Sequence, residues 1–238
     1  MHRFQPRFWP TVIMLTMMAM VIGLGTWQLH RRVWKTELLA TIAERMNGAV
    51  APLPAAIDNP PDWIFRRVTV AGRFDTDHVF WLYGRTYDGK AGVHLLVPLI
   101  REQGDAILVD RGFVPFEHGS QLAPFEPALP DSETIDGIVR QPETGGLFMP
   151  SSRPEANVWY GVDIGAMSAA VGRTLAPVYI AARASEGATG WPAATGGTEG
   201  TGIRNEHLNY AIFWYSMAVV LAAIYVISSR TRPTASKP

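Results

Sequence analysis

The residues of this sequence that could do chemistry gather at the inner ends of its two long uncharged runs. Residues 25–35 read GTWQLHRRVWK and place two Trp, one His, two Arg and one Lys in eleven positions. Residues 205–215 read NEHLNYAIFWY and carry His207 among aromatic side chains. A His can ligate haem iron, rings pack on the macrocycle, and Arg binds carboxylates such as the propionates. These residue types therefore suit a haem site.

The spacing gives each run one helical stripe of small and aromatic residues. In the second run the stripe starts at His207 and continues with Tyr210, Ala211, Trp214 and Ala218. In the first run it consists of Thr16, Ala19, Gly23 and Trp27. If the two stripes face each other, Trp27 and His207 lie at about the same depth, and three cations surround that point: Arg31, Arg32 and Arg204.

The same residues have a simpler interpretation. Trp and Tyr anchor the ends of spanning helices at the membrane interface, and Arg there binds lipid headgroups. A His at the start of a span is often only a polar cap. Residue chemistry leaves both interpretations open, and the anchor is the commoner arrangement.

Two runs of 22 residues without a charge, 8–29 and 208–229, predict transmembrane helices, because about 20 apolar residues cross a bilayer. The first run is too long for the apolar part of a signal peptide, and no A-x-A-like cleavage site follows it before Trp27.

The charges at the chain ends predict the orientation. The tails, residues 1–7 and 230–238, carry several Arg and Lys and are therefore expected in the cytoplasm. Residues 30–207 are expected in the periplasm of a bacterial cell, held at the inner membrane. Arg31, Arg32 and Lys35 at the start of this loop argue the other way, but long loops are translocated largely regardless of charge.

The loop between the spans predicts a mainly β domain. Runs rich in β-branched and aromatic residues predict strands at 65–74, 78–85, 92–100, 105–115, 134–141, 156–163 and 176–183. Tight turns predict an antiparallel meander among the first of these. Residues 31–46 continue or restart the first helix, 164–172 predict a short helix, and 51–61, 116–131 and 187–202 predict loops. The expected fold class is membrane-anchored α+β: two transmembrane helices flanking a mainly antiparallel β extracytoplasmic domain.

Composition and motifs exclude several functions. The net charge of +0 gives no field that attracts nucleic acid, and the absence of Cys excludes disulfides and thiolate sites. No G-x-S-x-G, H-E-x-x-H or phosphate-binding Gly motif occurs, so we expect no enzyme. Three His lack metal-ligand spacing and are expected to be structural: His78, His94 and His118. Asp110 and Arg111 are expected to form an internal ion pair.

Four segments, in order, resemble the SURF1 family. The pattern G-x-W-Q-L-x-R-R-x-W-K begins at Gly25, and N-x-H-L-x-Y-A-x-x-W-[FY] begins at Asn205. Between them lie GVHLLVPL and VDRGFVP (109–115), although Asp110 and Phe113 stand where the family more often has Asn and Trp.

The resemblance implies an assembly factor for cytochrome c oxidase. Bacterial members of the family bind haem a and hand it towards the catalytic subunit I, which implies haem a synthase as the donor and the lipid bilayer as the surroundings. The His in the second motif is His207, the implied iron ligand. With the residues near it, the implied haem-binding set is His207, Trp27, Gln28, Arg31, Arg32, Tyr210 and Trp214. The alternative is a haem-free scaffold that stabilises subunit I during assembly.

Overall fold

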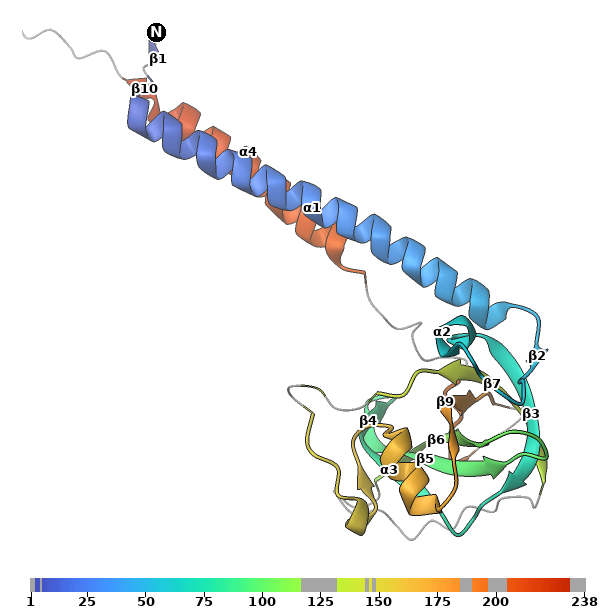
Figure 1. Ribbon diagram of the computed structural model, residues 1–238. Helices are drawn as coiled ribbons and strands as arrows, with labels where there is room; N and C mark the ends of the chain where they lie inside the picture. Colours follow the sequence, from blue (N-terminus) through green and yellow to red (C-terminus); the bar gives the residue numbers. More distant parts are fainter. Residues whose placement is uncertain are drawn as a thin grey trace, which may run out of the picture. The chain divides into compact units, whose positions relative to one another are not determined.

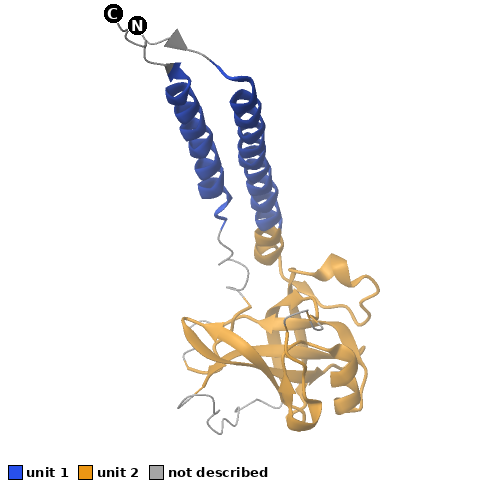
Figure 2. Ribbon diagram, turned by 90° about the vertical axis from the view of Figure 1, so that its left-hand side faces the viewer, with its two compact units in different colours: residues 1–41, 203–238 blue, residues 42–202 orange. Residues whose placement is uncertain are grey.

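A computed structural model describes residues 3–4, 6–116, 132–143, 146, 149–184, 190–196 and 205–231. The chain forms two compact units, residues 1–41 with 203–238 and residues 42–202 (Figures 1 and 2). The first unit contains the two long apolar helices, and the second contains the β domain. The predicted fold class is confirmed.

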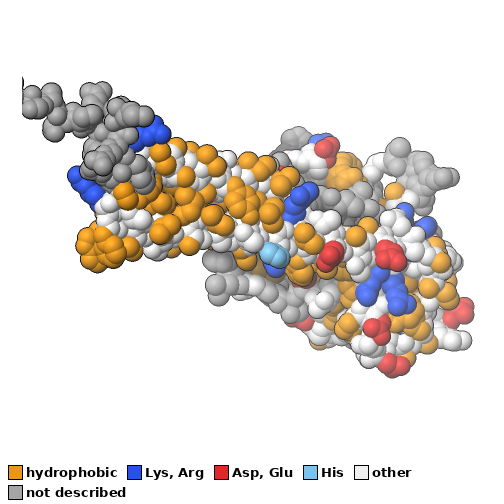
Figure 3. Space-filling model, turned by 90° about the horizontal axis from the view of Figure 1, so that it is seen from above, with side chains coloured by type: hydrophobic (Ala, Val, Ile, Leu, Met, Phe, Trp, Pro, Cys, Tyr) orange, Lys and Arg blue, Asp and Glu red, His pale blue; other side chains and the backbone are white. Residues whose placement is uncertain are grey.

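The helices are α1, Phe8–Asn47, and α4, His207–Ser228. Both are long and apolar enough to cross a membrane. Their apolar side chains are largely exposed, for example Ile13 at 58% and Val219 at 69%, and hydrophobic side chains cover the helices in Figure 3. The core helix of a soluble protein would be buried, so this exposure fits a lipid environment. Residues 31–46 continue α1 rather than restarting it.

A short antiparallel pairing joins the outer ends of the two helices. Strand β1, Arg3–Phe4, pairs with β10, Arg230–Thr231. The helices run side by side in Figures 1 and 2. The described residues nearest the two termini, Arg3–Phe4 and Arg230–Thr231, therefore lie at the same end of the helix pair.

The β domain is an eight-stranded sheet in the order β2-β3-β7-β9-β6-β5-β4-β8, and β3 also pairs with β5, which closes a barrel. The strands are β2 Ala51–Pro52, β3 Arg67–Phe74, β4 Phe80–Tyr87, β5 Lys90–Ile100, β6 Ala106–Pro115, β7 Glu133–Arg140, β8 Val158–Trp159 and β9 Leu175–Ala182. The short helices are α2 Pro60–Trp63, the 3-10 turn η1 Pro154–Ala156 and α3 Ile164–Val171. The meander is limited to β4-β5-β6, because β3 pairs with β7 and the end of β5 and not with β4. On the other side of β6, β9 joins it in parallel.

Several predicted boundaries are corrected. The strand expected at 156–163 is only Val158–Trp159. The Pro-rich segment ends in α2, which starts at Pro60, since Pro is tolerated in the first turn of a helix. Residues 117–131 of the expected loop lie outside the described residues. Part of the Gly-rich segment, 190–196, is hydrogen-bonded to strands: the Phe113 and Ala193 backbones exchange bonds of 2.9 and 2.8 Å.

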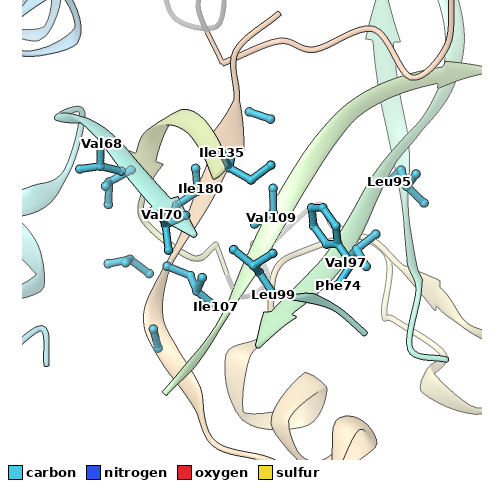
Figure 4. Packing of buried hydrophobic residues seen from close by; sticks show 14 of the residues in the cluster. Val68, Val70, Phe74, Leu95, Val97, Leu99, Ile107, Val109, Ile135 and Ile180 are labelled. Carbon is cyan, nitrogen blue, oxygen red and sulfur yellow. The ribbon is translucent and has the colours of Figure 1, made fainter. Parts of the chain in front are cut away.

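The main core lies inside the barrel, and side chains alternate between it and the outer face. Leu95, Val97 and Leu99 of β5 point into this core (Figure 4). Leu96 points to the other side, into a second cluster that α3 covers with Met167 and Val171. Strand β5 is therefore apolar on both faces, as buried strands are.

A pair of charged side chains links neighbouring strands at the rim of the barrel. The Arg67 guanidinium donates hydrogen bonds to both carboxylate oxygens of Asp136, across β3 and β7. This hydrogen bonding lowers the pKa of Asp136, although burial alone would raise it.

Candidate functional site

The two long helices pack through seams of residues spaced alternately four and three apart, as in coiled coils. On α4 the seam is His207, Ala211, Trp214, Ala218, Leu221 and Tyr225, each buried or half-buried. On α1 it is Met14, Met18, Val21, Gly25 and Gln28. Four residues of the predicted α4 stripe lie on this seam, whereas Tyr210 is exposed.

A small residue on α1 allows the close approach, as is common between membrane helices. A side chain at Gly25 would place its Cβ 3.0 Å from the ring of Tyr215. Hydroxyl contacts accompany this packing: Thr26 Oγ1 lies 3.1 Å from the Tyr215 hydroxyl, and Thr11 Oγ1 lies 2.5 Å from the Tyr225 hydroxyl.

The stripe expected on α1 does not face α4. Trp27 is 57% exposed, and no atom lies within 4 Å of a Cβ built on Gly23. Each of the two stripes of α1 contains one glycine, Gly23 or Gly25. The face with Val21 and Gly25 packs instead, because it lets the Tyr215 ring lie against the Gly25 backbone.

His207 and Gln28 meet at the inner end of the helix pair. The imidazole Nδ1 of His207 lies 2.7 Å from Oε1 of Gln28. An amide oxygen can only accept a hydrogen bond, so Nδ1 donates in this contact, and in the neutral imidazole the lone pair is then on Nε2. Both residues are half-buried. A hydrogen bond to one ring nitrogen is the usual way in which proteins orient a His whose other nitrogen binds a metal.

Cations and an amide lie next to this pair in sequence. The Arg31 guanidinium lies 3.9 Å from the ring centroid of Trp34, and both Arg31 and Arg32 are exposed. Asn205 donates to the backbone oxygen of Arg32 at 3.3 Å and to Thr36 Oγ1 at 3.2 Å. This joins the start of the second motif to the end of the first. Arg204 lies outside the described residues.

The aromatic residues of the predicted set divide into two groups. Trp214 is half-buried on the seam with His207, and its ring meets Phe213 edge-on at 5.4 Å. Tyr210 is 56% exposed and, like Trp27, points away from the seam. His30 Nδ1 donates to the Thr26 backbone oxygen at 2.9 Å, one turn earlier in the same helix. The structure thus brings His207, Gln28 and Trp214 onto one seam but leaves Trp27 and Tyr210 outside it.

This donor set fits haem better than a bare metal ion. Within the ranges that the structure describes, no three His, Asp or Glu side chains converge on a point that could hold an ion. Haem needs only an axial ligand from the protein, which Nε2 of His207 can supply. Arg31 and Arg32 supply donors for the carboxylates.

Two His of the β domain are structural, as expected. His78 Nδ1 lies 3.0 Å from Asp75 Oδ2, and the buried His94 Nδ1 lies 2.7 Å from Asp110 Oδ2. His118 lies outside the described residues. The expected pair of Asp110 and Arg111 is wrong: Asp110 also accepts from the Gly112 N–H at 2.9 Å. Arg111 instead donates to Glu133 Oε2 at 2.5 Å. Arg111 is the extra residue of a bulge in β6.

Comparison with known proteins identifies the family of the chain. The family model of the SURF1 family matches residues 15–219. The SURF1-like protein of Monosiga brevicollis is 35% identical over 235 residues, which cover 91% of this chain and 86% of that protein. Surfeit locus protein 1 of Mus musculus is 31% identical (89% and 73% covered), and that of Homo sapiens 29% (90% and 75%). The match includes both helices and the β domain between them, and the chain belongs to the SURF1 family.

Proposed function

We propose that this protein assists the assembly of cytochrome c oxidase by holding haem a at His207 and passing it to the oxidase catalytic subunit I. Membership of the SURF1 family supports the role in oxidase assembly. The observation that carries the haem proposal is the 2.7 Å contact between His207 and Gln28. It gives a helix-end His a fixed tautomer, which an interface anchor would not need.

The geometry suits a carrier. His207 offers Nε2 as one axial ligand, and a single protein ligand permits release to an acceptor site. Gln28 accepts from Nδ1–H and so raises the basicity of the ring. Trp214, half-buried two turns along α4, offers a ring face, and the exposed Arg31 and Arg32 offer bidentate donors to propionates. Haem a synthase is the proposed donor, and no catalytic reaction is assigned to the chain.

The exposed aromatic residues favour a second function, a haem-free scaffold for subunit I. Trp27, Trp34 and Tyr210 are 57%, 48% and 56% exposed. Rings of this size are the usual anchors of a helix partner or of the lipid interface. In this case His207 would act only as a helix cap, and the helix pair would bind the spans of subunit I directly.

Co-purified haem distinguishes the two functions. The full chain is co-expressed with the haem a synthesis enzymes and purified in detergent. We expect close to stoichiometric haem a, identified by the pyridine haemochromogen spectrum and the reduced-minus-oxidised spectrum. A colourless protein that still captures subunit I would overturn the carrier proposal in favour of the scaffold. If haem b or haem o co-purifies in place of haem a, the haem-binding site is supported but the haem type in the proposal is wrong.

We also propose that the protein lies in a bacterial inner membrane with both termini in the cytoplasm and the β domain in the periplasm. The chain has no Cys, so single-Cys variants report their position without background. We expect a membrane-impermeant maleimide to label Asp77→Cys, in an exposed turn, in intact cells. Ser236→Cys should react only after lysis. The reverse pattern would contradict this orientation, and the unsubstituted chain provides the blank.

A further inference from the structure

A polar pocket opens on the face of the barrel wall opposite the main core. Its volume is about 480 Å³, within the range of small-molecule sites. Arg85, His94, Asp110 and Arg140 line it together with Phe65. The second apolar cluster and α3 cover the neighbouring part of this face. All residues that line the pocket belong to the β domain, and none of them belongs to the proposed haem site.

A β-bulge turns Arg85 into the pocket. Leu82 pairs with His94 and Arg85 pairs with Gly92, so two residues of β4 oppose one residue of β5. One of the two is Gly84, with φ at +74°. Because side chains alternate along a strand, the extra residue puts Arg85 on the same side as Leu82 and His94.

A second bulge lies in β6, the neighbour of β5 on the edge away from β4, next to the carboxylate of Asp110. Leu96 pairs with Asp110 and Leu95 pairs with Gly112, which leaves Arg111 as the extra residue. The bulge turns the Gly112 N–H onto Asp110 Oδ1 at 2.9 Å, while His94 Nδ1 lies 2.7 Å from Oδ2. Both oxygens of this carboxylate are engaged, and it is only 3% exposed.

A strained residue supports the other guanidinium. Phe65 has φ at +65°, a left-handed conformation that a bulky side chain rarely adopts. Its N–H donates to the Val139 oxygen at 2.9 Å, which holds it there. The Arg140 guanidinium carbon lies 5.4 Å from the centroid of the Phe65 ring, and Arg140 is 9% exposed. Strain of this kind is concentrated at binding sites.

One donor in the pocket has no partner within the described part of the chain. The Nε atom of Arg85 is buried and makes no hydrogen bond to any of these residues. Buried donors are almost always paired in native proteins, because an unpaired one loses its hydration without replacement. An acceptor that binds in the pocket would satisfy it.

We propose that this pocket binds a small organic monocarboxylate. Guanidinium groups pair bidentately with carboxylates, and Phe65, Leu82 and Pro142 give an apolar wall for the organic part. The other titratable groups that line the pocket are His94, Asp110, Glu143 and Tyr179. Asp110 and Glu143 bring negative charge close to the two Arg, so a singly charged ligand is accommodated better than a phosphate dianion.

Benzoate is the probe, added to the full chain in lipid nanodiscs and followed by saturation-transfer NMR with empty nanodiscs as the blank. We expect saturable binding in the low-millimolar range, since a ligand of this size reaches about −4 kcal/mol. Benzamide, its neutral analogue, should bind at least about 10-fold more weakly, because it forfeits the charge-assisted bonds. Inorganic phosphate should not compete at equal concentration.

Arg85→Gln should weaken benzoate binding at least about 10-fold, and Arg85→Lys should restore only part of it, because Lys lacks the planar fork. Arg173→Gln removes an exposed Arg outside the pocket and should change nothing. Circular dichroism verifies that each variant is folded. Equal binding of benzoate and benzamide, unchanged affinity in folded Arg85→Gln, or tighter binding of phosphate would each overturn the proposal.

Discussion

Gly112→Ala is expected to lower the free energy of unfolding of the β domain by about 3–4 kcal/mol. Gly112 has φ at +126°, and an added Cβ would lie 2.1 Å from the backbone oxygen of Ala193. The Ala193 oxygen belongs to the backbone and cannot move aside as the end of a flexible side chain can. The segment 190–196 must therefore move away from β6, and both Phe113–Ala193 hydrogen bonds are lost. Because domains are stable by only about 5–15 kcal/mol, the loss is large.

Gly172→Ala is the matched control. Gly172 also has a positive φ, +68°, at the end of α3, but no atom lies within 4 Å of its Cβ position. It should cost about 1 kcal/mol, the penalty for the left-handed backbone alone. Urea denaturation of the full chain in detergent, followed by Trp fluorescence, measures both variants. Equal losses for the two would mean that Ala193 does not press on Gly112.

Local residue types were enough to predict most of the elements. The length of the uncharged runs predicted both long helices, and β-branched and aromatic runs predicted β3 to β7 and β9 to within a few residues. The short helix α3 was also predicted, at 164–172. Pairing was predicted less well. The parallel contact of β9 with β6 depends on the crossover through α3, which no local pattern specifies.

The register of β6 against β5 was also not predictable from local residue types. His94 lies on the same face as Asp110 because Asp110 pairs with Leu96, two residues along β5. Arg111 is an extra residue that shifts the rest of β6 by one position, and an alternation pattern gives no sign of it beyond the Gly that permits it. The expected pair of Asp110 and Arg111 is wrong because His94 and the Gly112 N–H hold Asp110, while Glu133 holds Arg111. The pocket around Arg85 was not predicted either, because Arg85 lines it through an extra residue in β4 that local residue types do not show.

The candidate haem site shows what a motif can and cannot predict. Gln28 and His207 were both singled out, one in each motif, but their contact depends on which face of α1 packs. Two faces of α1 carry a glycine, Gly23 on one and Gly25 on the other, and the face with Gly25 lies against the Tyr215 ring. The expectation that the Trp27 face packs against α4 is wrong, because a Trp at a helix end suits the membrane interface as well as a pocket between helices.

His207→Ala should abolish the co-purified haem a, since it removes the only axial ligand that the proposed site offers. Gln28→Leu keeps the volume but removes the acceptor of the Nδ1 proton. The loss of an outer partner of a metal-binding His typically costs about 10–100-fold in affinity, so this variant should retain haem only at high haem supply. His30→Ala, at an exposed His bonded only within its helix, should retain full haem.

Comparison of two Gln28 variants shows whether His207 is an iron ligand or only a helix cap. Gln28→Glu replaces the amide oxygen by a carboxylate, which holds the Nδ1 proton more strongly and makes Nε2 a better donor to iron. If His207 is the ligand, Gln28→Glu should keep the haem and shift its reduced spectrum, whereas Gln28→Leu should lower the haem content at limiting haem supply. If His207 only caps α4, neither variant should alter the haem content, and both should change only the thermal stability of the helix pair. Haem content and spectrum together therefore decide the role of His207.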